Sequence, residues 1–324
     1  MFRQLPSAFL YTLISCANAA MKHDLPRPDP FADPRHDPYN PLKYIASNTL
    51  TGIAVALILA VGLLQTWLIV KTGARWMMSM TIGIYFFALG LSFRFGLHVH
   101  PQSKGIYIME YLFVVLSPCA FIAADYVLLG RLAKHLNADK HLLVTSRRIT
   151  IVYVGSDIST FLIQAVGGAM SASANDPIMA LAGSRVFLAG LAAQLLSFLS
   201  FSCIYLIFLY RLRKHDPEIW AMDTTKKWYN SWIALAGALL ISCIGILVRS
   251  GFRVVELSEG FQGRLTTSQP LFYGLDTLPL FVAIVVYIPF WPGRFISRPM
   301  TRNRNEDDTA NRGSKESKEI SDSS

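Results

Sequence analysis

Seven long apolar stretches, separated by short polar segments, dominate this chain. A helix needs about 20 consecutive, mostly apolar residues to cross the hydrocarbon core of a membrane. Lipid offers the backbone no hydrogen-bond partner, so chains cross it as helices or as closed barrels, and these lengths suit helices. The sequence therefore predicts an all-α, polytopic seven-helix transmembrane bundle, with helices at 48–70, 76–97, 106–130, 149–170, 181–210, 229–250 and 271–291.

The low share of charged residues supports a membrane protein. Of the 324 residues, 52% are hydrophobic and 16% are charged, whereas a typical soluble domain carries about 25% charged residues. The net charge of +9 comes from Lys and Arg that lie mainly between the apolar stretches, where they would flank membrane segments. Because the sequence shows no nucleic-acid-binding motif, we expect no nucleic-acid partner.

The two ends of the chain differ in composition from the apolar middle part. Residues 1–19 combine Arg3, an apolar stretch and an Ala17-Asn18-Ala19 cleavage pattern, which indicates a signal peptide; an uncleaved interfacial helix is the alternative. Residues 20–47 are expected to form an irregular extracellular segment, because six prolines between 22 and 43 exclude a helix. The seven-helix membrane domain is assigned to 48–296, and the polar residues 297–324 are expected to form a disordered cytoplasmic tail.

The placement of positive residues predicts the orientation. With the N-terminus outside, the inner loops and the start of the tail hold 16 Lys or Arg residues, including Arg147 and Arg148. The outer loops hold five: Arg94, Lys104, Arg249, Arg253 and Arg264. Cytoplasmic loops carry the excess of positive charge in membrane proteins, so we expect the N-terminus outside and the C-terminus in the cytoplasm.

Cysteine and histidine give no sign of a metal or cofactor. Cys119, Cys203 and Cys243 lie inside apolar stretches without a C-x-x-C pair, which favours packing roles. His98 and His100 have no evident third ligand, so we interpret them as a loop pair and expect no cofactor. The chain also lacks a Walker A sequence, a G-x-S-x-G elbow and an H-E-x-x-H helix, so we expect no enzyme activity.

Polar side chains within the predicted helices are the candidate functional residues. Ionisable groups in a membrane are costly and by default mark a pathway or a paired site. Asp157 and Gln164 are seven residues apart and share a helix face, as do Arg249, Arg253 and Glu256. Each also has a plainer interpretation: Asp125 beside Arg131 at the inner interface, a surface pair of Arg253 with Glu256, or glutamines that only hold helices together. The candidates for a substrate pathway are Asp125, Asp157, Gln164, Gln194, Arg249, Arg253, Glu256, Tyr273 and Asp276.

The order of these motifs resembles a known family. Ala123-Ala124-Asp125-Tyr126 is followed by Asp157 with Gln164, and then by an R-x-x-F-R-x-x-E block that runs from Arg249 to Glu256. The Tyr273 to Asp276 step and Trp291-Pro292-Gly293 close the series. In these features the chain is similar to the fungal RTA1-like family, also called lipid-translocating exporters.

The sequence departs from that family at two places. In the second predicted helix, Phe87 and Leu91 stand where the family usually has an acid and a tyrosine. Before the seventh, Ser268-Gln269 replaces His-Glu. Two carboxyl groups of the family pattern are thus missing, which implies altered substrate or coupling, or no transport, if those acids serve transport.

The resemblance implies a function. Members of the family look like seven-helix proteins of the plasma membrane or vacuole, and the plasma membrane is our first expectation here. They are linked with export or flipping of sphingoid long-chain bases, with porphyrin handling and with tolerance to sterol-like drugs. The resemblance thus implies a translocator of lipids or amphiphiles, with membrane lipids or amphiphilic small molecules as partners, moving them by facilitated or gradient-coupled transport. A seven-helix sensor or receptor-like protein is the alternative, and an integral membrane enzyme ranks last.

Overall fold

The computed structural model describes residues 29–296, except 38, 175, 222–230, 261–262 and 264. Within these residues the regular elements are all helices. Six helical stretches are long and apolar enough to cross a membrane: α2 (Asn48–Thr72), η1 with α3 (Arg75–Val99), α4 (Lys104–His135), α5 (Ser146–Ser173), α6 (Pro177–His215) and α8 (Trp232–Ser258). Short helices are η2 (Asp139–His141), α7 (Pro217–Ala221) and α11 (Pro292–Ile296). The all-helical prediction is confirmed.

The predicted seventh helix is shorter than the other six. It consists of α9 (Gln269–Leu271), the π-helical turn η4 (Phe272–Thr277) and α10 (Leu278–Val285). Pro279 has no N–H to donate within a helix, and the wider turn is one way a chain accommodates a proline. The helical part ends at Val285 instead of 291, and residues 286–290 follow as turns. The count of seven spanning helices is not confirmed.

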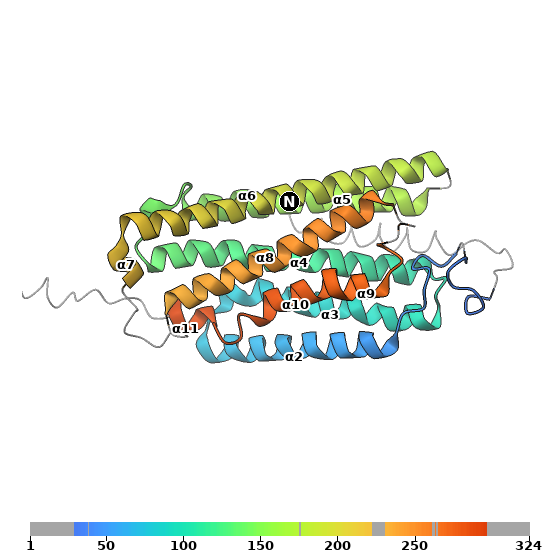
Figure 1. Ribbon diagram of the computed structural model, residues 1–324, viewed down its shortest axis with the longest axis horizontal. Coiled ribbons are helices and arrows are strands. Elements are labelled where there is room, and N and C mark those ends of the chain that lie inside the picture. Colours follow the sequence, from blue (N-terminus) through green and yellow to red (C-terminus); the bar gives the residue numbers. More distant parts are fainter. Residues whose placement is uncertain are drawn as a thin grey trace, which may run out of the picture.

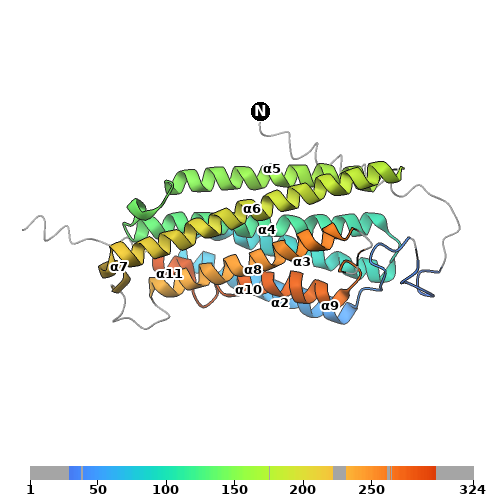
Figure 2. The same cartoon turned by 45° about the horizontal axis from the view of Figure 1, so that its top comes forward.

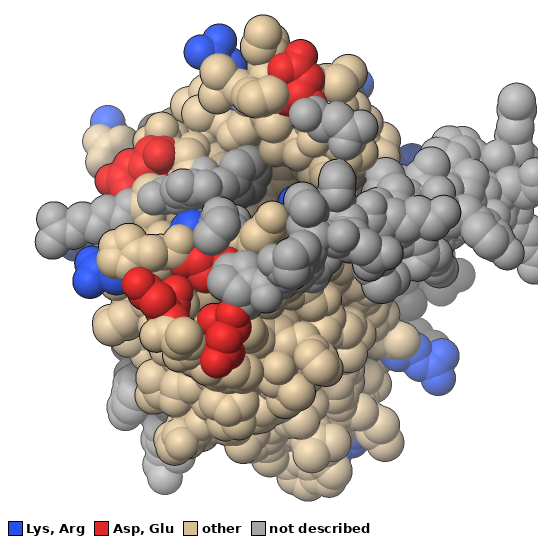
Figure 3. All heavy atoms as spheres, turned by 90° about the vertical axis from the view of Figure 1, so that its right-hand side faces the viewer, with Lys and Arg blue, Asp and Glu red and all other residues tan. Residues whose placement is uncertain are grey.

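The long helices lie side by side along the long axis of the molecule (Figures 1 and 2). α5 and α6 form a hairpin along one edge, and α3 packs against α4. Residues 29–47 lie at one end, the right-hand end in Figure 1, while α7 and α11 lie at the opposite end. We call the end with residues 29–47 the outer end, following the predicted orientation, and the opposite one the inner end. Figure 3 shows the outer end, where acidic side chains gather on a largely uncharged surface.

Local signals in the sequence set where the helices begin. The side chains of Ser47, Ser103 and Ser231 accept hydrogen bonds from the first turns of α2, α4 and α8, as N-caps do. Asp176 caps α6, and its first helical position is a proline, whose missing N–H costs nothing there. Gly73 ends α2 with a φ of 73°, a conformation that glycine adopts without strain.

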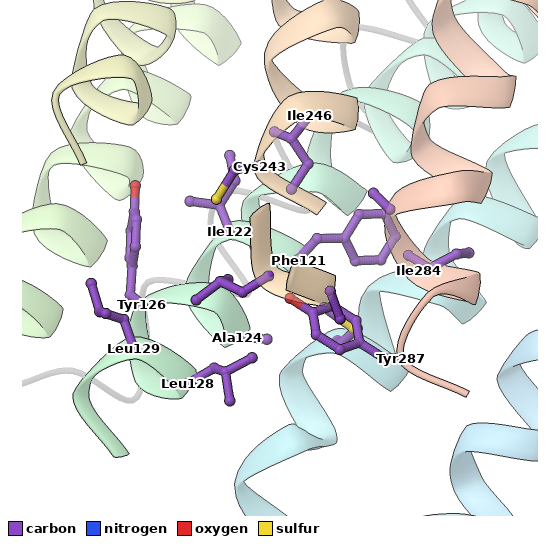
Figure 4. Close-up of a cluster of buried hydrophobic side chains, with 14 of the residues drawn as sticks. Phe121, Ile122, Ala124, Tyr126, Leu128, Leu129, Cys243, Ile246, Ile284 and Tyr287 are labelled. Carbon is purple, nitrogen blue, oxygen red and sulfur yellow. The ribbon is translucent and has the colours of Figure 1, made fainter. Parts of the chain in front are cut away.

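The main core consists of apolar side chains from α2, α3, α4, α6, α8 and α10. Figure 4 shows part of it, where side chains of α4 and α8 lie beside those of α10, among them Phe121, Ile246 and Ile284. The outward faces carry large apolar residues as well, such as Leu63 on α2 and Leu196 on α6, which are both more than half exposed. A surface of this kind suits contact with lipid tails, because it would be unfavourable in water.

Several predictions lie partly or wholly outside the described residues. The signal peptide at 1–19 and the tail at 297–324 fall outside them. Of the segment 20–47, residues 29–37 and 39–47 are described, and they form turns and irregular chain without a helix. Asp37, Asn40 and Leu42 are nevertheless buried there, so this part of the segment packs against the helices.

Candidate functional site

The R-x-x-F-R-x-x-E block of α8 forms a buried ionic network with the π-helical turn η4. Arg253 Nε donates to Asp276 Oδ1 at 2.6 Å, and Arg253 Nη1 donates to Glu256 Oε2 at 2.9 Å. Arg249 Nε lies 3.0 Å from the same oxygen of Asp276. All four side chains are buried, so the plainer interpretation of Arg253 and Glu256 as a surface pair is wrong. Two positive and two negative groups balance, as burial of charge requires.

Arg249 has a second partner, a backbone carbonyl of α4 that is left free by Pro118. Because proline lacks an N–H, the carbonyl four residues earlier in a helix loses its usual donor. That carbonyl belongs to Val114, and it accepts from Arg249 Nη2 at 2.7 Å and from Ser117 Oγ at 3.1 Å. Arg249 is thereby held between α4 and the Asp276 carboxylate.

A second buried ion pair joins α3 and α4. Arg94 Nη1 donates to Glu110 Oε1 at 2.7 Å, and Arg94 Nη2 donates to the Tyr44 hydroxyl at 2.6 Å. Arg94 is 1% exposed, although the sequence analysis counted it in an outer loop. Counting it with the outer loops is wrong, because Arg94 lies within α3 and is buried in the bundle. Removing one partner of a buried pair typically costs about 3–5 kcal/mol, since the other charge stays buried.

Aromatic rings connect the two ionic groups. The Phe272 ring has the Arg94 guanidinium 4.2 Å from its centroid and the Arg253 guanidinium at 5.5 Å. Tyr273, a predicted site residue, lies under Arg94 at 5.5 Å, and its hydroxyl is 2.9 Å from Thr51 Oγ1 of α2. Together with Asp276, these two rings bring η4 into contact with α2, α3 and α8.

Asp125 forms a separate polar group toward the inner half of the bundle. Its two carboxyl oxygens accept hydrogen bonds from Tyr287 Oη at 2.7 Å and from Ser242 Oγ at 2.8 Å. The residue is 0% exposed. The interpretation of Asp125 as a half-solvated neighbour of Arg131 is therefore wrong, and Arg131 stacks on Trp76 instead.

Asp157, Gln164 and Gln194 meet between α5, α6 and α4. Gln164 Nε2 donates to Gln194 Oε1 at 2.8 Å, and Gln194 Nε2 donates to Cys119 Sγ at 3.2 Å. Asp157 is 3% exposed, and neither of its carboxyl oxygens accepts a hydrogen bond of ordinary geometry. The Tyr126 hydroxyl is near enough to act on Asp157 as a weak hydrogen-bond donor, although its geometry lies outside the ordinary limits. We call Tyr126, Asp157, Gln164, Gln194 and Cys119 the acceptor cluster.

Glycines bring α5 and α6 close enough to form this cluster. A Cβ on Gly190 would lie 2.8 Å from Gln164 Cγ, and one on Gly167 would lie 2.4 Å from the backbone nitrogen of Phe187. Such distances leave room only for glycine, as in other close helix pairs in membranes. The glycines thus place the two glutamines within hydrogen-bond reach.

The structure brings some predicted site residues together and keeps others apart. One network contains Arg249, Arg253, Glu256 and Asp276, while the two glutamines bond to each other. No hydrogen bond or ion pair in the described part of the chain links Asp157 with Asp276. Cys119 interacts electrostatically with both Asp157 and Arg249, so it is the member of the acceptor cluster that lies nearest to the ionic network.

Sequence reasoning missed the pair of Arg94 with Glu110 as part of the site. The only signal in the sequence was a charged residue near the end of one predicted helix and another near the start of the next. Their pairing depends on how α3 and α4 pack against each other, which hydropathy alone does not show.

Outside the spanning helices, two pKa shifts mark further contacts. Burial raises the pKa of Tyr44, and the neighbouring Arg94 partly offsets this. At the inner end, hydrogen bonds from Lys140 and His141 lower the pKa of Asp216. Within the described residues, no three His, Cys, Asp or Glu side chains come together as a metal site.

Comparison with known proteins identifies the family. The family model described as RTA1 like protein matches residues 80–299. The chain is 29% identical to Protein RTA1 of Saccharomyces cerevisiae over 65% of its own length and 63% of that protein, and 31% identical to Protein RTM1 of the same organism over 56% of each. It is 24% identical to the Sphingoid long-chain base transporter RSB1 of Saccharomyces cerevisiae over 63% of its own length and 61% of that protein.

The chain spans less than two thirds of the length of these relatives. No solved structure matches it. The family match covers most of the bundle, including the acceptor cluster and both ionic groups. The chain belongs to the RTA1-like family.

Proposed function

We propose that this protein moves amphiphiles with a protonated amine head across a membrane. Two relatives carry transport names, a sphingoid long-chain base transporter and a protoporphyrin uptake protein. A sphingoid base is an amphiphile with an amine head and an apolar tail. The apolar outer faces of the helices suit the tail, and the buried polar groups suit the head.

The observation that carries this proposal is that the acceptor cluster has more unpaired acceptors than unpaired donors. Four buried atoms there have no hydrogen-bond partner: Tyr126 Oη, Asp157 Oδ1, Asp157 Oδ2 and Gln164 Oε1. Three of them are acceptors only, and an unpaired carboxylate in an apolar setting is costly. A proton or a bound cation would remove this cost. An ammonium group brings one positive charge and N–H donors, which suits the Asp157 carboxylate.

The two acidic candidates take different roles in this proposal. Asp276 is neutralised by two guanidinium groups, so it is suited to holding η4 against α8. Asp157 has no such partner, so it is the group that exchanges a proton or an amine. In this proposal the path of the head group leads from Asp157 past Gln194, Cys119 and Arg249 toward Glu256 near the outer end. Movement along it is facilitated or coupled to a gradient.

The proposal includes the topology. The helical residues 269–285 are about 26 Å long at 1.5 Å per residue, and residues 286–290 continue as turns. We propose that this segment makes the seventh crossing, with the N-terminus outside and the protein in the plasma membrane. Three of the five positive residues counted outside, Arg94, Arg249 and Arg253, are buried and paired, which increases the inner excess of positive charge.

The test is movement of a labelled long-chain amine in vesicles that contain the purified protein, with and without a pH gradient. We expect protein-dependent movement that Asp157→Asn reduces at least tenfold, because the amide cannot carry the charge. Asp176→Asn is the matched control: Asp176 caps α6 at its surface end, and asparagine caps a helix equally well.

Two results would count against the proposal. If wild-type protein moves no amine amphiphile, the translocator function fails and a sensor becomes the better account. If both Asn variants move the amine at the wild-type rate, Asp157 has no part in the movement.

A further inference from the structure

A strap of chain covers the outer end of the Arg94–Glu110 pair. Residues 39–46, which we call the strap, come directly before the N-cap of α2. Asn40 and Ala46 are each 1% exposed, and Leu42 is also buried. Lys43 turns the strap with a φ of 58°, an uncommon conformation for a residue other than glycine.

One face of α3 and the loop after it hold the strap. Arg94 Nη2 donates to the Tyr44 hydroxyl at 2.6 Å, and four residues later His98 Nδ1 donates to the Ala46 carbonyl at 2.7 Å. Residues spaced by four lie on one helix face. In the loop after α3, Gln102 Nε2 donates at 2.9 Å to Asp37 Oδ2, which lies just before the strap. These polar contacts follow one line along α3 and the loop after it.

The apolar contacts of the strap are separate from the main core. Leu42 and Ala46 pack with Leu97 in a small cluster of their own, beside Ile106 and Tyr107. The large core of the bundle does not include these residues. Segments with few apolar contacts open at lower free-energy cost than the core. The strap can therefore detach while the helices stay packed.

The strap is also connected to the ionic groups beneath it. The Tyr44 hydroxyl accepts a hydrogen bond from Arg94, which pairs with Glu110. The Arg94 guanidinium also lies over the ring of Phe272 in η4. The strap continues into α2, where Thr51 meets the hydroxyl of Tyr273. Release of Tyr44 would thus free one side of Arg94 and bring the outer ends of α2 and η4 within reach of water.

We propose that the strap is an outer gate, and that Tyr44 is the positioning residue that holds it closed on Arg94. This inference rests on the proposed transport function. The gate opens to admit or release the polar head of the amphiphile, and the bundle keeps its packing during the opening.

Hydrogen exchange of the protein in nanodiscs tests the opening without reference to transport. Loss of one hydrogen bond shifts an opening equilibrium by roughly fivefold to tenfold. We expect Tyr44→Phe to speed amide exchange in residues 39–46 by this factor and to leave α8 unchanged. Tyr210→Phe, at the inner end of α6, is the control and should change neither. Equal exchange of the strap in both variants would overturn the role of Tyr44.

A disulfide between Leu42→Cys and Leu97→Cys tests the gate. Both positions lie in the same small cluster, and the two single variants control for the native cysteines. We expect oxidation to stop amphiphile movement only in the double variant, and reduction to restore it. Full movement by the oxidised, cross-linked protein would overturn the gate while the transport function stands. No movement by wild-type protein would refute transport instead, and the exchange result would still decide whether the strap opens.

Discussion

Asp125 and Asp157 are both buried without a cationic partner, but they differ in their hydrogen bonds. Asp125 accepts from Tyr287 and Ser242, so its site is satisfied by the protein itself. Asp157 is buried to a similar degree, but it accepts no hydrogen bond of ordinary geometry, and the Tyr126 hydroxyl is only a weak donor to it. An unsatisfied buried group lowers stability, and proteins retain such groups mainly where function needs them. In the proposed function, this contrast assigns Asp125 a structural role and Asp157 the functional one.

The same Asp→Asn change should therefore have different effects on stability at the two positions. Asp125→Asn replaces one acceptor oxygen with an NH₂ group that cannot accept, which should cost about 1–3 kcal/mol. Asp157→Asn removes an unpaired carboxyl and should leave the melting temperature equal or higher. Thermal unfolding of both variants in detergent checks this. A larger loss of stability at Asp157 than at Asp125 would mean that Asp157 has a partner within the fold.

The α5–α6 hairpin carries most of the acceptor cluster, and its close packing depends on particular glycines. Gly167 faces the backbone of Gly183 and Phe187, whereas Gly155 on the same helix has no atom within 4 Å of an added Cβ. The sequence shows both as glycines in an apolar helix, so only the structure separates them. Close approach is a property of two helices together.

Alanine substitutions at Gly167 and Gly155 should have different effects on the stability of the protein. Gly167→Ala forces the helices apart and should cost about 1–3 kcal/mol or more, as overpacking does. Gly155→Ala should be neutral or stabilise by up to about 1 kcal/mol, because alanine is the better helix former. Melting temperatures of the two variants measure the difference. Equal values would show that α5 and α6 do not pack as described.

At the scale of the whole molecule, the apolar lengths predicted the bundle well. Six helices lie where their apolar residues placed them, because lipid solvation acts on each segment separately. The seventh was overextended at its C-terminal end, since residues 286–290 are apolar but form turns instead of a helix, and hydropathy does not distinguish the two. The spacing of the two arginines and the glutamate in α8 predicted one shared face, but their partners Asp276 and Val114 come from other helices. Such partners follow from the packing and not from local sequence.

The orientation is a prediction for the whole chain. Cysteines introduced at Asp33 and at Lys214 occupy exposed positions at opposite ends of the bundle. In intact cells, a membrane-impermeant maleimide should label Asp33→Cys and should reach Lys214→Cys only after permeabilisation. Wild-type protein controls for the native cysteines. The reverse labelling pattern would place the N-terminal segment inside and contradict the account.

The most direct test of the central claim compares two head groups on one tail. Movement of a long-chain amine and of the matching long-chain alcohol would be measured in vesicles with wild-type protein and with Asp157→Asn. The account predicts that wild-type protein moves the amine about tenfold faster, which corresponds to roughly 1.4 kcal/mol, and that Asp157→Asn abolishes this preference. An equal preference for the amine in both proteins would contradict the assignment of Asp157 as the group that receives the head.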